Sequence, residues 1–216
     1  MGINTKICAI VGASPAANIA FIQTALQKAD FIICADGGWD HVHAAGKQPQ
    51  LMIGDFDSAE IALPEQVEVV TLPTNKDDTD LLAAVKEGLK RGYTQFLLLG
   101  ALGGRTDHTY GNLCVLQYIA GQGGTAVLQS ENTAVYLLLP DQTLQLSGVQ
   151  GKTVSVFPFG CERCTLTYTG LEYPLQQGTL VSYVPLGVSN VAQQEDISIV
   201  CHSGTAVIMA LDLEQK

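Results

Sequence analysis

The stretch FLLLGALGGRTDH, residues 96–108, holds the pattern that decides the fold. A run of apolar residues leads into a glycine-rich turn, and a helical pattern follows from 106 to 121. A short, continuously apolar run that ends in such a turn is typical of a strand buried inside a parallel sheet. The stretch therefore predicts a strand, a loop and a helix, with the loop at the carboxyl end of the strand.

The same alternation recurs through the first 130 residues. Apolar runs that predict strands lie at 6–12, 31–35, 51–53, 67–71 and 96–99. Helical patterns lie at 15–28, with Ser14 as the N-cap and Pro15 at the first position, and at 77–91 and 106–121. Continuous apolar strands separated by helices predict an α/β domain with a mostly parallel, doubly wound sheet that helices cover on both faces.

The pattern changes at about residue 132. The remaining chain reads as short strands without a strong helix, at 134–139, 143–146, 153–157, 165–169, 180–184, 197–201 and 205–211. Glycine-rich turns separate these strands, which is typical of an all-β sandwich of the jelly-roll kind. We therefore expect two domains, residues 1–131 and 132–216.

Charge and cysteine content exclude several classes of protein. The chain has 21 acidic and 11 basic residues, a formal net charge of -10, and only Lys152, Arg163 and Lys216 are basic after residue 131. A nucleic-acid partner is therefore not expected, because phosphate binding needs a basic face. No apolar run reaches the ~18–20 residues that cross a bilayer, so no membrane partner is expected.

The six cysteines do not have the pattern of a disulfide scaffold. Cys8, Cys34 and Cys114 stand in apolar segments and are expected to be buried. Cys161 and Cys164 form one isolated C-x-x-C pair, fewer than the four ligands of a structural zinc site. We expect a reduced, cytoplasmic protein.

Acidic residues follow several of the predicted strands. Asp36 follows the strand at 31–35, and Asp55 and Asp57 follow the strand at 51–53. In an extended chain, alternate side chains such as Asp55 and Asp57 point to one side and can share a divalent cation. An acidic turn explains this piece equally well when it is taken alone.

A second acidic cluster, KDDTD at 76–80, opens the helix predicted at 77–91. Asp77 and Asp80 are three residues apart and would share a helix face. Acids in a first helical turn are ordinarily partners of the helix dipole. That explanation does not account for a second aspartate pair, and the recurrence favours a Mg²⁺ ion that is also bound by phosphate oxygens.

The loop at 100–108 is the third element. Its glycines let main-chain N–H groups approach phosphates at a helix N-terminus, and Arg105 offers a planar fork for phosphate oxygens. Asp107 supplies another carboxylate. The loop is neither a Walker A sequence nor G-x-G-x-x-G. The alternative is a glycine-rich turn with Asp107 in the first turn of a helix.

Taken in order, these motifs resemble the thiamine pyrophosphokinase family. The resemblance rests on ADGG at 35–38, GDFDS at 54–58, KDDTD at 76–80 and GGRTDH at 103–108, and continues at TGLEYPL, 169–175, and GVSN, 187–190. It implies transfer of a pyrophosphoryl group from ATP to the hydroxyethyl arm of thiamine, with release of AMP. It also implies an α/β catalytic domain, a thiamine-binding β-sandwich, and a homodimer with active sites between subunits.

The resemblance also implies roles for individual residues. Asp55, Asp57, Asp80 and Asp107 would be catalytic and, with Asp77, would hold Mg²⁺. Contacts to ATP would come from Asp36, Lys76, Thr79, Gly103, Gly104, Arg105, His108, Ser130 and Asn132. Tyr173, where some members have tryptophan, would stack on thiamine, and Ser189 and Asn190 would hydrogen-bond it.

Two alternatives stay open. One is a Mg²⁺-dependent pyrophosphokinase or phosphohydrolase that acts on another small alcohol or nucleotide. The other is a thiamine or nucleotide sensor that binds without turnover. The residues also leave the general base undecided between Asp57, Asp80 and Asp107.

Overall fold

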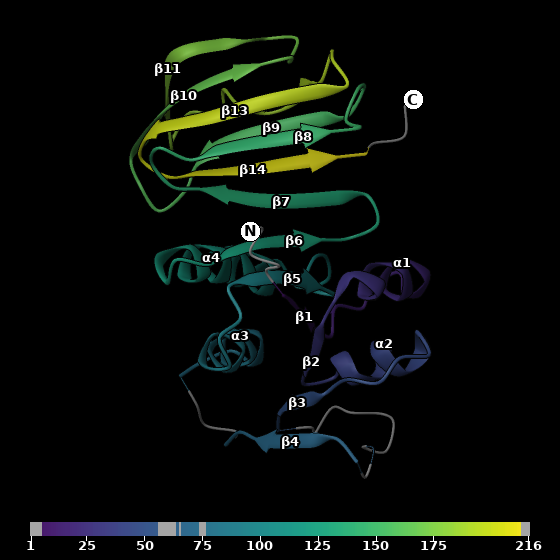
Figure 1. The fold of residues 1–216 in the computed structure, drawn as a ribbon. Coiled ribbons are helices and arrows are strands. Elements are labelled where there is room, and N and C mark those ends of the chain that lie inside the picture. Colours follow the sequence, from purple (N-terminus) through teal and green to yellow (C-terminus); the bar gives the residue numbers. More distant parts are fainter. Residues whose placement is uncertain (1–5, 56–63, 65, 74–76, 213–216) are drawn as a thin grey trace, which may run out of the picture. The chain divides into compact units, whose positions relative to one another are not determined.

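The structure is a computed structural model that describes residues 6–55, 64, 66–73 and 77–212 (Figure 1). The chain divides into two compact units, Met1–Glu131 and Asn132–Lys216. Each unit has its own hydrophobic core.

The first unit is built on six parallel strands. They are β1 (Ile7–Val11), β2 (Phe31–Ala35), β3 (Leu51–Gly54), β4 (Glu68–Thr71), β5 (Gln95–Leu99) and β6 (Thr125–Gln129). Their order is β6-β5-β1-β2-β3-β4, and each neighbouring pair is parallel. The predicted parallel sheet is confirmed, and β6 is a strand that the sequence pattern did not reveal.

Helices cover both faces of this sheet, as Figure 1 shows. The helices α1 (Ile19–Ala25) and α2 (Gly38–Ala44) pack against each other, as do α3 (Asp80–Lys90) and α4 (Thr106–Gly121). Buried side chains from β1, β2, β3, β5, α1 and α2 form one core, which includes Ile22, Trp39 and Met52. The doubly wound arrangement is therefore confirmed.

Two helices begin later than the sequence predicts. Helix α1 begins at Ile19, because the Asn18 side chain accepts the N–H of Phe21 at 3.0 Å, and it ends in a 3-10 turn, η1 (Leu26–Lys28). The prediction that Ser14 caps this helix is wrong. Helix α3 begins at Asp80, because the Thr79 hydroxyl accepts the N–H of Leu82 at 3.2 Å. Asp77 therefore lies outside the helix, and the helix predicted at 106–121 matches α4.

The second unit is an antiparallel β-sandwich, as predicted. Its strands are β7 (Thr133–Leu138), β8 (Thr143–Ser147), β9 (Thr153–Pro158), β10 (Arg163–Thr169), β11 (Leu175–Val181), β12 (Asn190–Val191), β13 (Asp196–Ser203) and β14 (Ala206–Leu211). Neighbouring strands are hydrogen-bonded in two sets, in the orders β12-β9-β14-β7 and β11-β10-β13-β8. Side chains from both enclose one core that includes Val156, Leu166, Leu180, Ile199 and Ile208.

The strand predicted at 180–184 is shifted. Strand β11 ends at Val181, because the chain then turns and the N–H of Val184 bonds the Val181 carbonyl at 3.2 Å. Tyr183 and Val184 follow this turn and are exposed, so these two apolar residues lie in a surface loop and not in a buried strand.

The six cysteines are free thiols. Cys8 and Cys34 are buried as predicted, and burial raises the pKa of the Cys8 thiol to about 12. The prediction of a buried Cys114 is wrong, because α4 buries the side that carries Val115 and Ile119 and leaves Cys114 exposed. In the described part of the chain, every helix is too short or too polar for a bilayer crossing.

Gly38 lets the start of α2 lie directly on β1. A Cβ atom at Gly38 would lie 1.9 Å from the Val11 carbonyl oxygen, so no other residue fits without a backbone shift. His41, one turn further along α2, bonds the Gly12 carbonyl through Nδ1 at 3.0 Å. This contact places the loop after β2 against the loop after β1.

A pair of glycine substitutions tests this packing. Gly38→Ala is expected to destabilise the first unit by at least about 2 kcal/mol, because the methyl group overlaps the Val11 carbonyl. Gly111→Ala, inside α4 with open space around it, is expected to stabilise by about 0.5–1 kcal/mol. Urea unfolding followed by fluorescence of Trp39, the single tryptophan, measures both. Equal stability changes in the two variants would contradict the account.

Candidate active site

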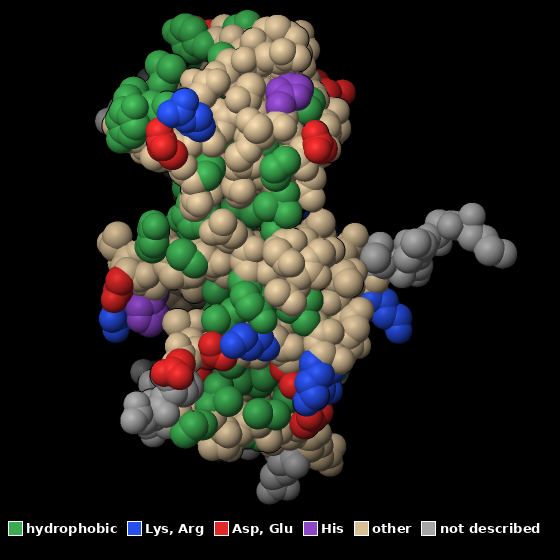
Figure 2. Space-filling model, turned by 90° about the vertical axis from the view of Figure 1, so that its left-hand side faces the viewer, with side chains coloured by type: hydrophobic (Ala, Val, Ile, Leu, Met, Phe, Trp, Pro, Cys, Tyr) green, Lys and Arg blue, Asp and Glu red, His purple; other side chains and the backbone are tan. Residues whose placement is uncertain are grey.

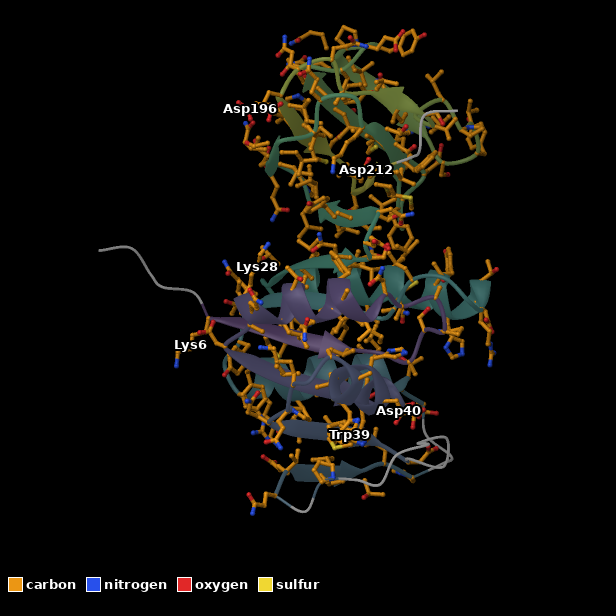
Figure 3. The ribbon with its side chains drawn as sticks, turned by 90° about the vertical axis from the view of Figure 1, so that its right-hand side faces the viewer. Lys6, Lys28, Trp39, Asp40, Asp196 and Asp212 are labelled. Atoms are coloured by element: carbon orange, nitrogen blue, oxygen red, sulfur yellow. The ribbon has the colours of Figure 1, made fainter. Side chains whose placement is uncertain are left out.

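The parallel strands of the first unit bring several sequence motifs to one edge of the sheet. Val11 pairs with Cys34 and with Leu99, and Ala35 pairs with Ile53. The segments that follow β1, β2, β3 and β5 therefore begin side by side at the carboxyl edge. In Figure 3, Lys6, just before β1, marks the amino edge, and Asp40 lies at the opposite, carboxyl edge. Ligands of doubly wound sheets bind at this edge.

The glycine-rich loop after β5 is held by three successive carbonyl groups. The Gly100 carbonyl accepts the N–H of Ser14 at 2.8 Å, and the Leu102 carbonyl accepts the Ser14 hydroxyl. Between them, the Ala101 carbonyl accepts Nδ2 of Asn112 at 2.8 Å. These bonds turn the carbonyl oxygens toward the protein and fix the loop in front of α4.

Two positions in this loop have a left-handed backbone, which favours glycine. Gly103 has φ +80° and Gly104 has φ +70°, conformations that residues with a side chain rarely adopt. Both are exposed and precede the N-terminus of the 16-residue helix α4. A glycine turn at the start of a long helix suits an anion such as a phosphate group.

Arg105 and Asp107 form a two-bond ion pair at the start of α4. Arg105 donates from Nε to Oδ1 at 3.1 Å and from Nη2 to Oδ2 at 2.6 Å, and both side chains are largely exposed. The hydrogen bond from Arg105, with a smaller contribution from the N–H of His108, lowers the pKa of the Asp107 carboxyl to about 2. The guanidinium fork that holds this carboxylate has the geometry that also binds phosphate oxygens. The His108 side chain is exposed beside this pair.

Asp36 and Asp55 follow neighbouring strands. Asp36 has φ +49°, and its N–H bonds the Ile53 carbonyl at 2.7 Å, which draws it against β3. A Cβ atom at Gly54 would lie 2.9 Å from the Asp36 Cα, so only glycine permits this approach. A left-handed backbone at an aspartate costs energy, and such residues are concentrated at functional sites. Asp55 is half-buried directly after Gly54.

The described residues of the acidic cluster at the start of α3, 77–80, have different surroundings. Asp78 pairs with Nζ of Lys86 at 2.6 and 2.8 Å, and Thr79 caps the helix. Asp77 is exposed and Asp80, the first residue of α3, is half-buried. The predicted helix face shared by Asp77 and Asp80 is wrong, because only Asp80 is helical. Asp57 and Lys76 lie outside the described residues.

In the ranges 6–55, 64, 66–73 and 77–212, no three His, Cys, Asp or Glu side chains form a group that could hold a metal ion. The carboxylates at the sheet edge are hard oxygen donors, the type that Mg²⁺ prefers. Magnesium is usually held by one or two carboxylates with phosphate oxygens and waters. The donor chemistry of Asp55, Asp77, Asp80 and Asp107 therefore fits Mg²⁺ that arrives with a phosphate ligand.

Ser130 and Asn132 fall in different units. Ser130 directly follows β6, whose last residue, Gln129, pairs with Leu99, so Ser130 lies at the same sheet edge as Gly100. Asn132 is exposed in the second unit, where its side-chain oxygen accepts the Thr133 hydroxyl at 3.1 Å.

In the second unit, Tyr173 is 66% exposed in the segment between β10 and β11. Asn190 is buried, and its side chain bonds the main chain of Tyr173 in both directions. Ser189 has φ +59° and donates its N–H to the Ser155 hydroxyl at 3.0 Å. The structure thus brings Tyr173, Ser189 and Asn190 together.

Two features of the structure were not found from the sequence. One is Asn112, whose bond to Ala101 involves a main-chain carbonyl that has no sequence pattern. The other is a set of exposed apolar side chains in the loop after β11, namely Tyr183, Leu186 and Val188. Figure 2 shows hydrophobic side chains gathered on the surface of the second unit.

Models of two protein domains match the chain, one in each unit. The model of the thiamin pyrophosphokinase catalytic domain matches residues 22–128, and the model of the thiamin pyrophosphokinase vitamin B1 binding domain matches residues 141–206. Thiamine pyrophosphokinase 1 of Oryza sativa is 28% identical over 207 residues, 82% of this chain and 77% of that protein. Thiamin pyrophosphokinase 1 of Caenorhabditis elegans is 23% identical over 221 residues, 97% and 90% of the two chains.

Solved structures share the fold of the chain. Thiamine pyrophosphokinase from Bacillus subtilis has a TM-score of 0.82 and 23% identity, and the match covers 96% of this chain and all of that chain. Thiamin pyrophosphokinase from Candida albicans has a TM-score of 0.75 at 16% identity, over 95% and 90% of the two chains. The two family models together match most of the sequence, in the order of its two units, and the chain belongs to the thiamin pyrophosphokinase family.

Proposed function

We propose that the protein transfers a pyrophosphoryl group from ATP to the hydroxyethyl group of thiamine and produces thiamine diphosphate and AMP. The observation that carries this proposal is the match of both the catalytic and the vitamin B1 binding family models to one chain. The glycine-rich loop at a helix N-terminus supports an ATP site, and the exposed Tyr173 supports a site for a flat organic cation.

ATP is proposed to bind at the carboxyl edge of the first unit. Its phosphates would lie on Gly103, Gly104 and the N-terminus of α4, where Arg105 exchanges its Asp107 partner for phosphate oxygens. The further contacts proposed for the nucleotide are Asp36, Lys76, Thr79, His108, Ser130 and Asn132. Binding on a prearranged loop orients the β-phosphorus for attack, which is the main contribution of a protein to phosphoryl chemistry.

Asp55, Asp57, Asp77, Asp80 and Asp107 are proposed to hold Mg²⁺ with the ATP phosphates. When bound, Mg²⁺ neutralises charge on the phosphate oxygens. These carboxylates would hold the ion, and Arg105 would balance part of the remaining negative charge on the phosphates. Asp55, Asp57, Asp80 and Asp107 would act closest to the reacting phosphate.

Thiamine is proposed to stack on Tyr173 and to receive a hydrogen bond from Ser189. The exposed phenol ring presents an apolar face to the cationic thiamine rings, an arrangement that favours binding through the ring quadrupole.

We further propose that the protein is a cytoplasmic homodimer whose active sites lie between subunits. The exposed side chains of Tyr183, Leu186 and Val188 support a partner surface on the second unit. The six free thiols are consistent with a reducing compartment.

The products identify the reaction. Incubation with ATP, Mg²⁺ and thiamine is expected to yield AMP and thiamine diphosphate in equal amounts, measured by chromatography. ADP or inorganic phosphate as the main product would favour the alternative, a pyrophosphokinase or phosphohydrolase that acts on another small alcohol or nucleotide. Binding of thiamine without turnover would favour the sensor.

Arg105→Lys tests the phosphate fork. The variant keeps the charge and loses the two-bond geometry, so the KM for ATP is expected to rise about tenfold with the melting temperature unchanged. Arg163→Lys is the matched control, because Arg163 forms an equally exposed pair with Glu162 at 2.6 Å in the second unit. Equal effects of both substitutions on the KM would remove Arg105 from the ATP site.

Complementation tests the homodimer. Asp80→Asn and Tyr173→Ala chains are each expected to be nearly inactive alone. If each site uses both chains, about half of the dimers in a statistical mixture are heterodimers with one intact site, so roughly a quarter of sites recover activity.

Asp78→Asn is the control for Asp80→Asn. Asp78 is committed to an exposed pair with Lys86, so this variant is expected to keep normal activity by itself. Verified chain exchange without recovered activity would show that each site is built within one chain.

A further inference from the structure

We infer that Asn190 is a positioning residue that holds Tyr173 for thiamine and does not itself bind thiamine. The inference rests on the proposed function, because it takes Tyr173 as the stacking residue. It replaces the expectation from family resemblance that Asn190 hydrogen-bonds the substrate.

The Asn190 side chain is occupied by the main chain around it. Its Oδ1 accepts the N–H of Tyr173 at 3.0 Å and the N–H of Val191 at 2.9 Å. Its Nδ2 donates to the Tyr173 carbonyl at 2.8 Å. The amide thus bonds both main-chain polar groups of Tyr173, much as a neighbouring strand would.

Burial separates the two residues. Asn190 is only 8% exposed, whereas Tyr173 is 66% exposed. A ligand that reaches the Tyr173 ring therefore finds little of the Asn190 amide on the surface. The buried Asn190 amide is placed to support the main chain of Tyr173, and the exposed Tyr173 ring is placed to contact the ligand.

Asn190 is itself fixed to the sheet. It pairs with Val154 of β9, and the preceding residue, Ser189, bonds the buried hydroxyl of Ser155 at 3.0 Å. The backbone at Glu172 also bonds Val191, at 2.8 Å. The sandwich thus holds the main chain of Tyr173 through Asn190, so the segment that carries the exposed ring is ordered before the substrate arrives.

Loss of the amide is expected to weaken thiamine binding specifically. Without it, the N–H and the carbonyl of Tyr173 lose their partners, and the segment samples conformations in which the ring does not face the substrate. The KM for thiamine would rise, while the KM for ATP, whose proposed contacts include neither Tyr173 nor Asn190, would stay the same.

A double-mutant cycle distinguishes positioning from direct contact. Thiamine binding to wild type, Asn190→Ala, Tyr173→Ala and the double variant is measured by calorimetry, with turnover measured in parallel. We expect each single variant to bind thiamine at least about tenfold more weakly, and the double variant no more weakly than Tyr173→Ala, because residues that act through one another are not additive. Fold-changes that multiply in the double variant, or normal binding by Asn190→Ala, would overturn the inference.

Two further variants separate this effect from general damage. Gln142→Ala removes a side-chain amide that accepts the N–H of Leu139 at 2.9 Å in the same unit, and it should leave the KM for thiamine unchanged. Asn190→Asp keeps the acceptor oxygen, loses the donor to Tyr173 and adds a carboxyl group, so the cycle can be repeated with it if Asn190→Ala does not fold. Wild type that binds thiamine without making thiamine diphosphate would contradict the proposed function and leave the cycle measurable.

Discussion

The parallel register of the first sheet is the constraint on which the candidate ATP site depends. Because Val11 is paired with both Cys34 and Leu99, the segments after β1, β2 and β5 must begin together at one edge. Their backbones then approach so closely that a Cβ atom at Gly100 would lie 2.4 Å from the Gly12 carbonyl oxygen. Glycine at position 100 is therefore a requirement of packing.

In each unit, an asparagine side chain bonds the main chain of a segment that is close in sequence to proposed ligand contacts. Asn112 donates to the Ala101 carbonyl and Asn190 donates to the Tyr173 carbonyl, each at 2.8 Å. In both cases the amide occupies main-chain groups of a segment that lies outside the regular strands. The energetic consequence is the same, since a loop that is already ordered loses less entropy when the ligand binds. The proposed phosphate and thiamine contacts are therefore prearranged.

Much of the fold could be predicted from the sequence, since continuous apolar runs such as 31–35 and 96–99 identify buried parallel strands directly. Helix starts were less predictable: Ser14 and Pro15 have the pattern of a helix N-terminus, yet Asn18 forms the cap and Ser14 bonds Leu102 instead. Cys114 is exposed because it lies on the face of α4 that is not buried, although its neighbours in sequence are apolar. Aspartates at strand ends located the candidate site, but the bonds of Asn112 and Asn190 depend on distant main-chain atoms that no sequence motif specifies.

The central claim is that this sheet edge supports transfer of two phosphorus atoms as one group. ATP labelled with radioactive phosphorus only at the β position tests this directly, with Mg²⁺ and thiamine present and the products separated by chromatography. The account predicts that the label enters thiamine diphosphate and that AMP carries none. Label retained in ADP would show transfer of the γ-phosphoryl group alone and would contradict the account.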